Sequence, residues 1–202
     1  MRILTKFLRA CVDPQQFPTA GPPEIAFLGR SNVGKSSLIN SLVGNKIAKT
    51  SNTPGRTQTI NFFEIRWPGR PKADLLFADL PGYGYARAPK DLVNEWPKFI
   101  NPYLAERSTL ALCVCLVDAN IPPQQSDVQL VDWLRHVDRP YVVVATKADR
   151  VGSKLQSSLT ALKDSLQTDN IVSYSSKTGH GKDALWKALR EAGERLDPTT
   201  KQ

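Results

Sequence analysis

One stretch near the N-terminus decides the fold: Glu24-Ile25-Ala26-Phe27-Leu28-Gly29-Arg30-Ser31-Asn32-Val33-Gly34-Lys35-Ser36. Its apolar first half predicts a buried β-strand, and the spacing of Leu38, Ile39 and Leu42 behind it predicts a helix. A Gly-x-x-x-x-Gly-Lys-Ser loop joins the two. This order predicts a phosphate-binding unit, because loop N–H groups and the positive end of the helix dipole both attract an anion.

The side chains of this loop indicate a nucleotide together with a divalent cation. Lys35 is placed to reach the β- and γ-phosphates, and the Ser36 hydroxyl is placed to ligate Mg²⁺. Gly29 and Gly34 allow the backbone to wrap closely around the phosphates.

Outward from the loop, short apolar runs alternate with helical patterns, which predicts an α/β fold around a mostly parallel sheet. The expected strands are Glu24–Leu28, Thr59–Trp67, Asp74–Ala78, Leu110–Val117, Tyr141–Ala145 and Asn170–Ser173. The expected helices are Gly34–Val43, Leu92–Glu106, Gln124–Val137, Ser153–Leu166 and Lys182–Leu196. The alternating pattern of Thr59–Trp67 predicts an edge strand, antiparallel to Asp74–Ala78 across a turn at Pro68–Pro71. The prediction is therefore six strands, with one antiparallel edge strand and helices on both faces.

Three further short motifs follow predicted strand ends. In Asp79-Leu80-Pro81-Gly82 the carboxylate is placed to hold Mg²⁺ through water, and the Gly82 N–H is placed to meet the γ-phosphate. In Thr146-Lys147-Ala148-Asp149 the final carboxylate can accept two hydrogen bonds from guanine N–H groups that adenine lacks, while the Lys147 stem lies along the base. Ser175-Ser176-Lys177 is expected to place loop N–H groups against the guanine O6. Together these motifs predict a guanine nucleotide.

Length and composition fit one cytoplasmic domain. The 202 residues contain no apolar run near the ~20 needed to span a bilayer, and Met1–Ala10 lacks the apolar centre of a secretory signal. Cys11, Cys113 and Cys115 form no disulfide framework, which predicts reduced thiols. The two isolated histidines, His136 and His180, do not indicate a zinc site.

The positive charge is concentrated in the first half of the chain. The formal net charge is +8, and residues 1–107 hold 15 Lys and Arg against 8 Asp and Glu. Such a bias favours a polyanionic partner, although part of it faces the nucleotide phosphates, and solvated surface lysines explain it equally well.

The order and spacing of the motifs resemble those of the TrmE–Era–EngA–EngB group of P-loop GTPases. The chain is most similar to the EngB family, also called YsxC or YihA, from Phe7 to Arg195. Thr146 stands where most GTPases have Asn, and EngB proteins usually have Thr. The resemblance rests on the segments Glu24–Asn40, Thr53-Pro54-Gly55-Arg56-Thr57-Gln58, Asn61-Phe62-Phe63, Asp79-Leu80-Pro81-Gly82-Tyr83-Gly84-Tyr85-Ala86, Thr146-Lys147-Ala148-Asp149 and Ser175-Ser176-Lys177.

The resemblance implies a Ras-like P-loop GTPase domain at residues 24–197, an N-terminal extension at 1–23 packed on it, and a tail at 198–202. It also implies that Thr57 ligates Mg²⁺ in the GTP state; by the residues alone, Thr53 and Thr59 were equal candidates. The implied metal ligands are Ser36, Thr57 and Asp79, and the implied catalytic residues are Lys35, Thr57, Asp79 and Asn32. The implied nucleotide-binding set is Gly29, Arg30, Ser31, Asn32, Val33, Gly34, Lys35, Ser36, Ser37, Gly55, Arg56, Thr57, Gln58, Thr59, Asp79, Leu80, Pro81, Gly82, Thr146, Lys147, Ala148, Asp149, Ser175, Ser176 and Lys177.

Hydrolysis is expected to be slow without help. Many GTPases position the attacking water with a glutamine directly after the Asp-x-x-Gly motif, and Tyr83 occupies that position here. Asn32 stands where related potassium-activated GTPases place an asparagine, so the resemblance implies stimulation by K⁺. The loops Lys46–Gln58 and Gly82–Lys90 are expected to order on the γ-phosphate and to relax after hydrolysis.

As partners, the resemblance implies ribosomal RNA in a precursor of the large ribosomal subunit, a need for the protein in cell division and septation, and a monomer. A nucleotide-dependent RNA contact is one possible role for side chains in or after the loops, namely Arg56, Tyr83, Tyr85, Arg87, Lys90, Trp96 and Lys98. The alternative for the three aromatic residues is packing against the neighbouring helix. Two other functions remain open. One is a division regulator that acts through protein partners, and the other is a P-loop phosphotransferase, against which the guanine motif argues.

Overall fold

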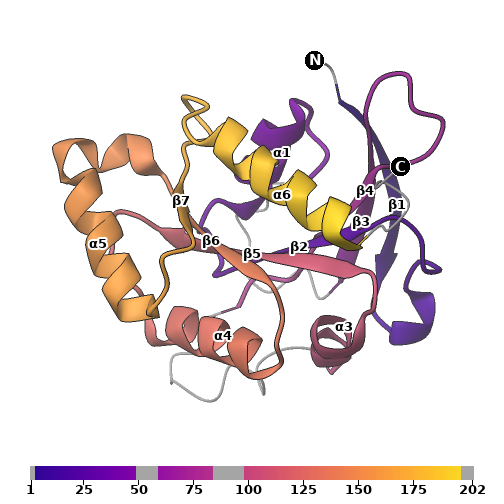
Figure 1. The fold of residues 1–202 in the computed structure, drawn as a ribbon, viewed down its shortest axis with the longest axis horizontal. Coiled ribbons are helices and arrows are strands. Elements are labelled where there is room, and N and C mark those ends of the chain that lie inside the picture. The colour runs from indigo at the N-terminus through magenta and orange to yellow at the C-terminus, as the bar shows by residue number, and fades with distance from the viewer. Residues whose placement is uncertain (1–2, 49–58, 84–97, 197–202) are drawn as a thin grey trace.

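A single seven-stranded sheet runs through the centre of the computed structural model, which describes residues 3–48, 59–83 and 98–196 (Figure 1). Its strand order is β1-β3-β4-β2-β5-β6-β7. The strands are β1 Leu4–Cys11, β2 Glu24–Gly29, β3 Ile60–Arg66, β4 Leu75–Asp79, β5 Leu110–Asp118, β6 Tyr141–Thr146 and β7 Ile171–Ser173. The helices are α1 Lys35–Val43, α3 Ile100–Glu106, α4 Gln125–His136, α5 Leu155–Leu166 and α6 Lys182–Leu196, with 3₁₀ turns at Pro14–Gln16, Ala148–Arg150 and Gly152–Lys154.

All six predicted strands are present, and β2, β4, β5, β6 and β7 pair in parallel, as expected for a mostly parallel sheet. The predicted hairpin is also present, because β3 pairs antiparallel with β4. The helix expected to begin at Leu92 is described only from residue 98 on, where α3 begins at Ile100.

The prediction of six strands with β3 at the edge was wrong in one respect. Residues Leu4–Cys11 form a seventh strand, β1, which pairs antiparallel with β3 and takes the edge position outside it. This strand buries Cys11 and packs Phe7 against Phe63 at 5.6 Å between ring centroids, while most of its other side chains are exposed or half-buried. It therefore lacks the apolar run by which the other strands were found, and its pairing with β3 supplies the stabilisation.

Helices cover both faces of the sheet, as predicted. Residues of α1 and α6 pack in one apolar cluster, and residues of α3, α4 and α5 pack in the other. Figure 1 shows α1 and α6 on one side of the sheet and α3 and α4 on the other. None of the helices in the described ranges combines the length and the hydrophobicity needed to cross a bilayer.

A buried carboxylate locks the end of the sheet opposite the phosphate loop. Glu24, at the start of β2, is fully buried and accepts hydrogen bonds from the Tyr103 hydroxyl at 2.9 Å and the Thr109 hydroxyl at 2.7 Å. Arg107 forms an ion pair with it and also donates to the Pro18 carbonyl at 2.6 Å. The hydrogen-bonded Glu24 carboxylate thus joins the N-terminal segment, β2 and α3. The phosphate loop follows the opposite end of the same strand, β2.

Candidate functional site

The four predicted motifs meet at one edge of the sheet. Gly29, Asp79 and Thr146 are the last residues of β2, β4 and β6, and Ser175 follows β7 by two residues. These strands run parallel, so their carboxyl ends lie along the same edge, where open α/β sheets bind ligands. Motifs that are more than 140 residues apart in the chain are thereby brought together.

The phosphate loop turns tightly out of β2. A Cβ atom at Gly29 would lie 2.8 Å from Cγ1 of Val33 and 3.0 Å from Cβ of Leu116, so only glycine fits there. Asn32 and Gly34 adopt left-handed backbone conformations, with φ of 63° and 105°, and α1 begins at the next residue. The loop therefore ends directly at a helix N-terminus, as a phosphate cradle requires.

The segment after β4 is bonded to this loop. Lys35 Nζ donates to Asp79 Oδ1, which joins the predicted phosphate lysine to the predicted metal-binding carboxylate. The Ser31 N–H donates to the Tyr83 carbonyl at 3.1 Å, and the Tyr83 N–H donates to the Gly29 carbonyl at 3.4 Å. A Cβ atom at Gly82 would lie 2.8 Å from Ser31 Oγ and 3.3 Å from Ser31 N and Cα, so a larger residue would force Ser31 to shift.

The third motif is attached to the same loop from the other side. The buried Thr146 hydroxyl lies 2.7 Å from the Val33 carbonyl and 2.9 Å from the Val117 carbonyl, and donates to them. Lys147 Nζ donates to the Asn32 carbonyl at 3.0 Å and to Asp118 Oδ2 at 2.6 Å. The loop is therefore held between β4 and β6, with its conformation set by neighbours on both sides.

The predicted guanine-reading carboxylate is exposed and oriented. Asp149 Oδ1 accepts a hydrogen bond from the buried Ser175 hydroxyl at 2.6 Å. That hydrogen bond lowers the pKa of the Asp149 carboxyl, which keeps it ionised at neutral pH and able to accept from N–H donors. Ser175 Oγ also accepts from the N–H groups of Lys177 and Thr178, both at 3.2 Å, so the fourth motif positions the third.

The remaining predicted residues lie around this centre in varied environments. Ser36 is half-buried in the first turn of α1, and Ser37, Ser176 and Lys177 are exposed. Leu80, Pro81 and Ala148 are buried, and the Thr59 hydroxyl lies 3.4 Å from Asn61 Oδ1. Four predicted residues fall outside the described ranges: Gly55, Arg56, Thr57 and Gln58.

The structure decides between the two roles left open for Tyr83. Its side chain is only 3% exposed and lies in the cluster with α3 and α4, so it packs in the core rather than offering a ring to RNA. Burial, together with the nearby Asp127 carboxylate, raises the pKa of its hydroxyl well above the ordinary value. Of the other proposed RNA-contact residues, Lys98 is exposed, and Arg56, Tyr85, Arg87, Lys90 and Trp96 lie outside the described ranges.

Two carboxylates near the site were missed by the sequence reasoning. Asp118 ends β5 and is paired with Lys147; burial opposes its ionisation, but hydrogen bonds from Lys147 and Asn120 outweigh burial and lower its pKa. Its place at a strand end was the signal that could have identified it. Asp127 lies beside Tyr83 in the first turn of α4, and no local pattern marked it.

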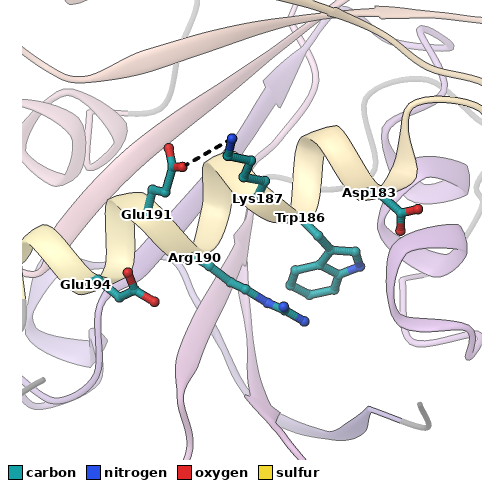
Figure 2. Close-up of a pocket in the computed structure, with 6 residues that line it drawn as sticks. All are labelled: Asp183, Trp186, Lys187, Arg190, Glu191 and Glu194. Carbon is teal, nitrogen blue, oxygen red and sulfur yellow. Dashed lines mark ion pairs between the residues drawn. The ribbon is translucent and has the colours of Figure 1, made fainter.

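A hollow of about 360 Å³ lies elsewhere, on α6 (Figure 2). Arg190 lies beside both Trp186 and Trp67, with its guanidinium carbon 6.0 Å and 5.0 Å from the ring centroids. Lys187 pairs with Glu191 at 3.9 Å. The predicted site includes none of the residues that line this hollow, which are Asp183, Trp186, Lys187, Arg190, Glu191 and Glu194. Within the described ranges, no three His, Cys, Asp or Glu side chains cluster as metal ligands.

Known proteins resemble this chain in both sequence and fold. A family model described as "50S ribosome-binding GTPase" matches residues 24–147. A probable GTP-binding protein EngB of Koribacter versatilis (strain Ellin345) is 62% identical over 201 residues, or 99% of each chain. A second, of Acidobacterium capsulatum, is 52% identical over 204 residues, which cover 100% of this chain and 97% of that one.

Solved structures agree at the level of the fold. A crystal structure of a probable GTP-binding protein engB matches with a TM-score of 0.64 at 24% identity, over 85% of this chain and 99% of that one. The structure of Era with MgGDPNP and a segment of 16S ribosomal RNA matches with a TM-score of 0.67 at 22% identity, over 84% and 56%. The Ras-like fold is thereby confirmed, and the family model and the similar EngB proteins confirm the GTPase prediction in preference to a small-metabolite phosphotransferase. The chain belongs to the EngB family of P-loop GTPases and is a GTP-hydrolysing enzyme.

Proposed function

We propose that this GTPase is a guanine-nucleotide switch that assists the assembly of the large ribosomal subunit. The observation that carries the proposal is the match of residues 24–147 to the 50S ribosome-binding GTPase family. The net charge of +8, concentrated in residues 1–107, supports an RNA partner, because phosphate contacts dominate nucleic-acid affinity. We further propose that the chain acts as a monomer in the cytoplasm, and that cells lacking it fail in division and septation.

Within this proposal Asp149 reads guanine. Its ionised carboxylate is exposed and already oriented by Ser175, so two N–H donors of guanine can bind it without further rearrangement. Adenine lacks these two N–H donors, so on binding adenine the Asp149 carboxylate would lose its hydrogen bonds to water and gain none from the base.

The phosphates and the cation are assigned to the loop. Lys35 neutralises the β- and γ-phosphates, and Gly82 donates its N–H to the γ-phosphate. Ser36 and Asp79 offer hydroxyl and carboxylate oxygens, the hard donors that Mg²⁺ prefers, and we assign Thr57 as the third ligand. Bound there, Mg²⁺ would offset the charge that develops between the β- and γ-phosphates.

Intrinsic hydrolysis is proposed to be slow. The side chain of Tyr83 is buried, and the residue that most often orients the water is a glutamine at that position. Asn32, whose side chain is exposed in the loop, is proposed to help bind a stimulating K⁺. Equal turnover in matched Na⁺ and K⁺ buffers would refute the K⁺ role.

The ribosomal proposal is tested by co-sedimentation of the full chain with precursors of the large subunit. We expect binding with a non-hydrolysable GTP analogue, weaker binding with GDP, and a steep loss as salt rises. Binding that ignores both nucleotide and salt would contradict the proposal, and binding only to division proteins would favour the protein-partner alternative.

The nucleotide assignment is tested with Asp149→Asn, and with Asp164→Asn as a matched control on the exposed surface of α5. Titration with fluorescent GDP should show at least a tenfold weaker affinity for the first variant, the scale of a lost hydrogen bond to a charged group, and no change for the control. Unchanged affinity for Asp149→Asn would remove the guanine role from this residue.

A further inference from the structure

The buried carboxylate of Asp127 joins α4 to the phosphate loop and to the segment that follows β4. Its side chain is 2% exposed, and its Oδ2 accepts from the Gln124 N–H at 3.0 Å, which caps the helix. Its Oδ1 accepts from the Tyr83 hydroxyl at 3.2 Å and lies 3.4 Å from Nε of Arg30. Arg30 is a residue of the phosphate loop, and Tyr83 is the first residue after the Asp-x-x-Gly motif.

These contacts close a ring. Tyr83 is bonded through its backbone to Gly29 and Ser31, on either side of Arg30, and a backbone bridge pairs it with Arg30 itself. Through its side chain it reaches Asp127, which in turn faces the Arg30 guanidinium. The segment that begins at Asp79 is therefore bound to the phosphate loop both directly and through α4.

Capping alone does not account for this arrangement. A carboxylate inside an apolar cluster is costly unless its partners satisfy it, and the capping contact with the Gln124 N–H uses only Oδ2. Burial indeed raises the pKa of the Asp127 carboxyl, against the opposing effects of Gln124, Arg30 and Tyr83. The partners beyond Gln124 both belong to the loops around the predicted γ-phosphate position.

We propose that Asp127 is a positioning residue for GTP hydrolysis, acting through Tyr83 and Arg30 to hold Gly82 in place against the phosphate loop. The inference rests on the proposed γ-phosphate role of Gly82, whose backbone lies so close to Ser31 that a Cβ atom would collide with it. We expect a loosened Tyr83 side chain to displace its neighbour Gly82 more than the guanine motif, which belongs to the segment after β6. The inference is independent of the ribosomal role.

The test uses the full chain and compares Tyr83→Phe, Asp127→Asn and the double variant. Asp132→Asn is the matched control, because Asp132 lies on the same helix, is 60% exposed and pairs with Arg135 at 2.8 Å, away from the phosphate loop. Hydrolysis is measured in single turnover with protein in excess. Affinities for fluorescent GDP and for a non-hydrolysable GTP analogue are measured on the same preparations, and rates are scaled to the GDP-binding fraction.

We expect hydrolysis to fall about tenfold in each single variant, the lower range for losing a hydrogen bond to a charged group. The affinity for the GTP analogue should fall several-fold while the affinity for GDP stays within twofold. The double variant should be no slower than the slower single variant, because both changes act on the hydrogen bond between Tyr83 and Asp127. The control should match the parent chain.

A purely structural role gives a different result. The melting temperature would then fall while the scaled hydrolysis rate and the ratio of GTP to GDP affinity stayed at the parent values, and that outcome overturns the proposal. If the fall in hydrolysis rate of the double variant equalled the product of the two single falls, the two residues would not act through one shared contact, and that part of the proposal would be overturned. If Asp127→Asn does not fold, Tyr83→Phe, which keeps the ring, decides alone. If the parent chain binds GDP and the non-hydrolysable GTP analogue with the same affinity, the result would instead overturn the proposed role of Gly82.

Discussion

The hydroxyl of Thr146 offers the sharpest test of how the tertiary structure prepares the phosphate loop. It is a single donor placed between two carbonyls, Val33 of the loop at 2.7 Å and Val117 of β5 at 2.9 Å. Thr146→Val keeps the shape and β-branching of the side chain and removes only this donor. The substitution therefore isolates one link between the guanine motif and the loop.

The expected magnitude follows from burial. Thr146 is 3% exposed and Val33 is 3% exposed, so water cannot readily replace the lost donor. A buried acceptor left without its partner costs about 1–3 kcal/mol. For a domain of this size each kcal/mol lowers the melting temperature by about 2–4 °C. Because the bond holds the loop in place, we expect GDP affinity to fall as well, by about fivefold or more.

The assay is a thermal melt combined with titration by fluorescent GDP. Thr160→Val is the control, since its hydroxyl also donates to a backbone carbonyl, that of Gln156 at 3.1 Å, but on the exposed side of α5. The control should differ from the parent chain by less than about 0.5 kcal/mol. If Thr146→Val lowers the melting temperature but binds GDP within twofold of the parent, the hydroxyl stabilises the sheet without preparing the loop, and the reasoning fails.

Three further predictions concern stability and reactivity. Arg107→Ala should destabilise the fold by about 3–5 kcal/mol in urea unfolding because it leaves Glu24 charged and buried, whereas Lys163→Ala, which breaks the exposed pair with Asp169, should cost under about 1 kcal/mol; equal losses would contradict the first expectation. The folded-state pKa of Asp118 lies below its ordinary value of 3.8, so its contribution is present above that pH and is lost as the pH falls through the lower folded-state pKa; Asp118→Asn should therefore lose less stability than the parent between pH 6 and pH 3, and parallel curves would count against this. Burial raises the pKa of Cys113 to about 12, so iodoacetamide at pH 8 should leave it unmodified in the folded chain and alkylate it in urea, and rapid native alkylation would show that the core opens.

Local pattern was sufficient for most of the architecture. Buried parallel strands are apolar along their whole length, so β5 and β6 could be recognised without any partner, and the loop between Gly29 and Ser36 identified itself by its glycines and its lysine. The edge strand β1 could not be found this way. Its side chains alternate weakly and two of them, Lys6 and Arg9, are basic, so the hydrogen bonds offered by β3 are what make it a strand.

The site divides along the same line. The residue types and their order can be read from the chain alone, since each motif is a short contiguous string whose chemistry depends on its own side chains. The contacts between the motifs depend on the folded sheet. Thr146 reaches Val33 across 113 positions, and Tyr83 turns inward to Asp127 instead of outward to solvent. Such contacts form because parallel strands bring their carboxyl ends to one edge of the sheet. The periodicity of apolar residues along the chain predicts each strand, but it does not predict which distant residues will meet at that edge.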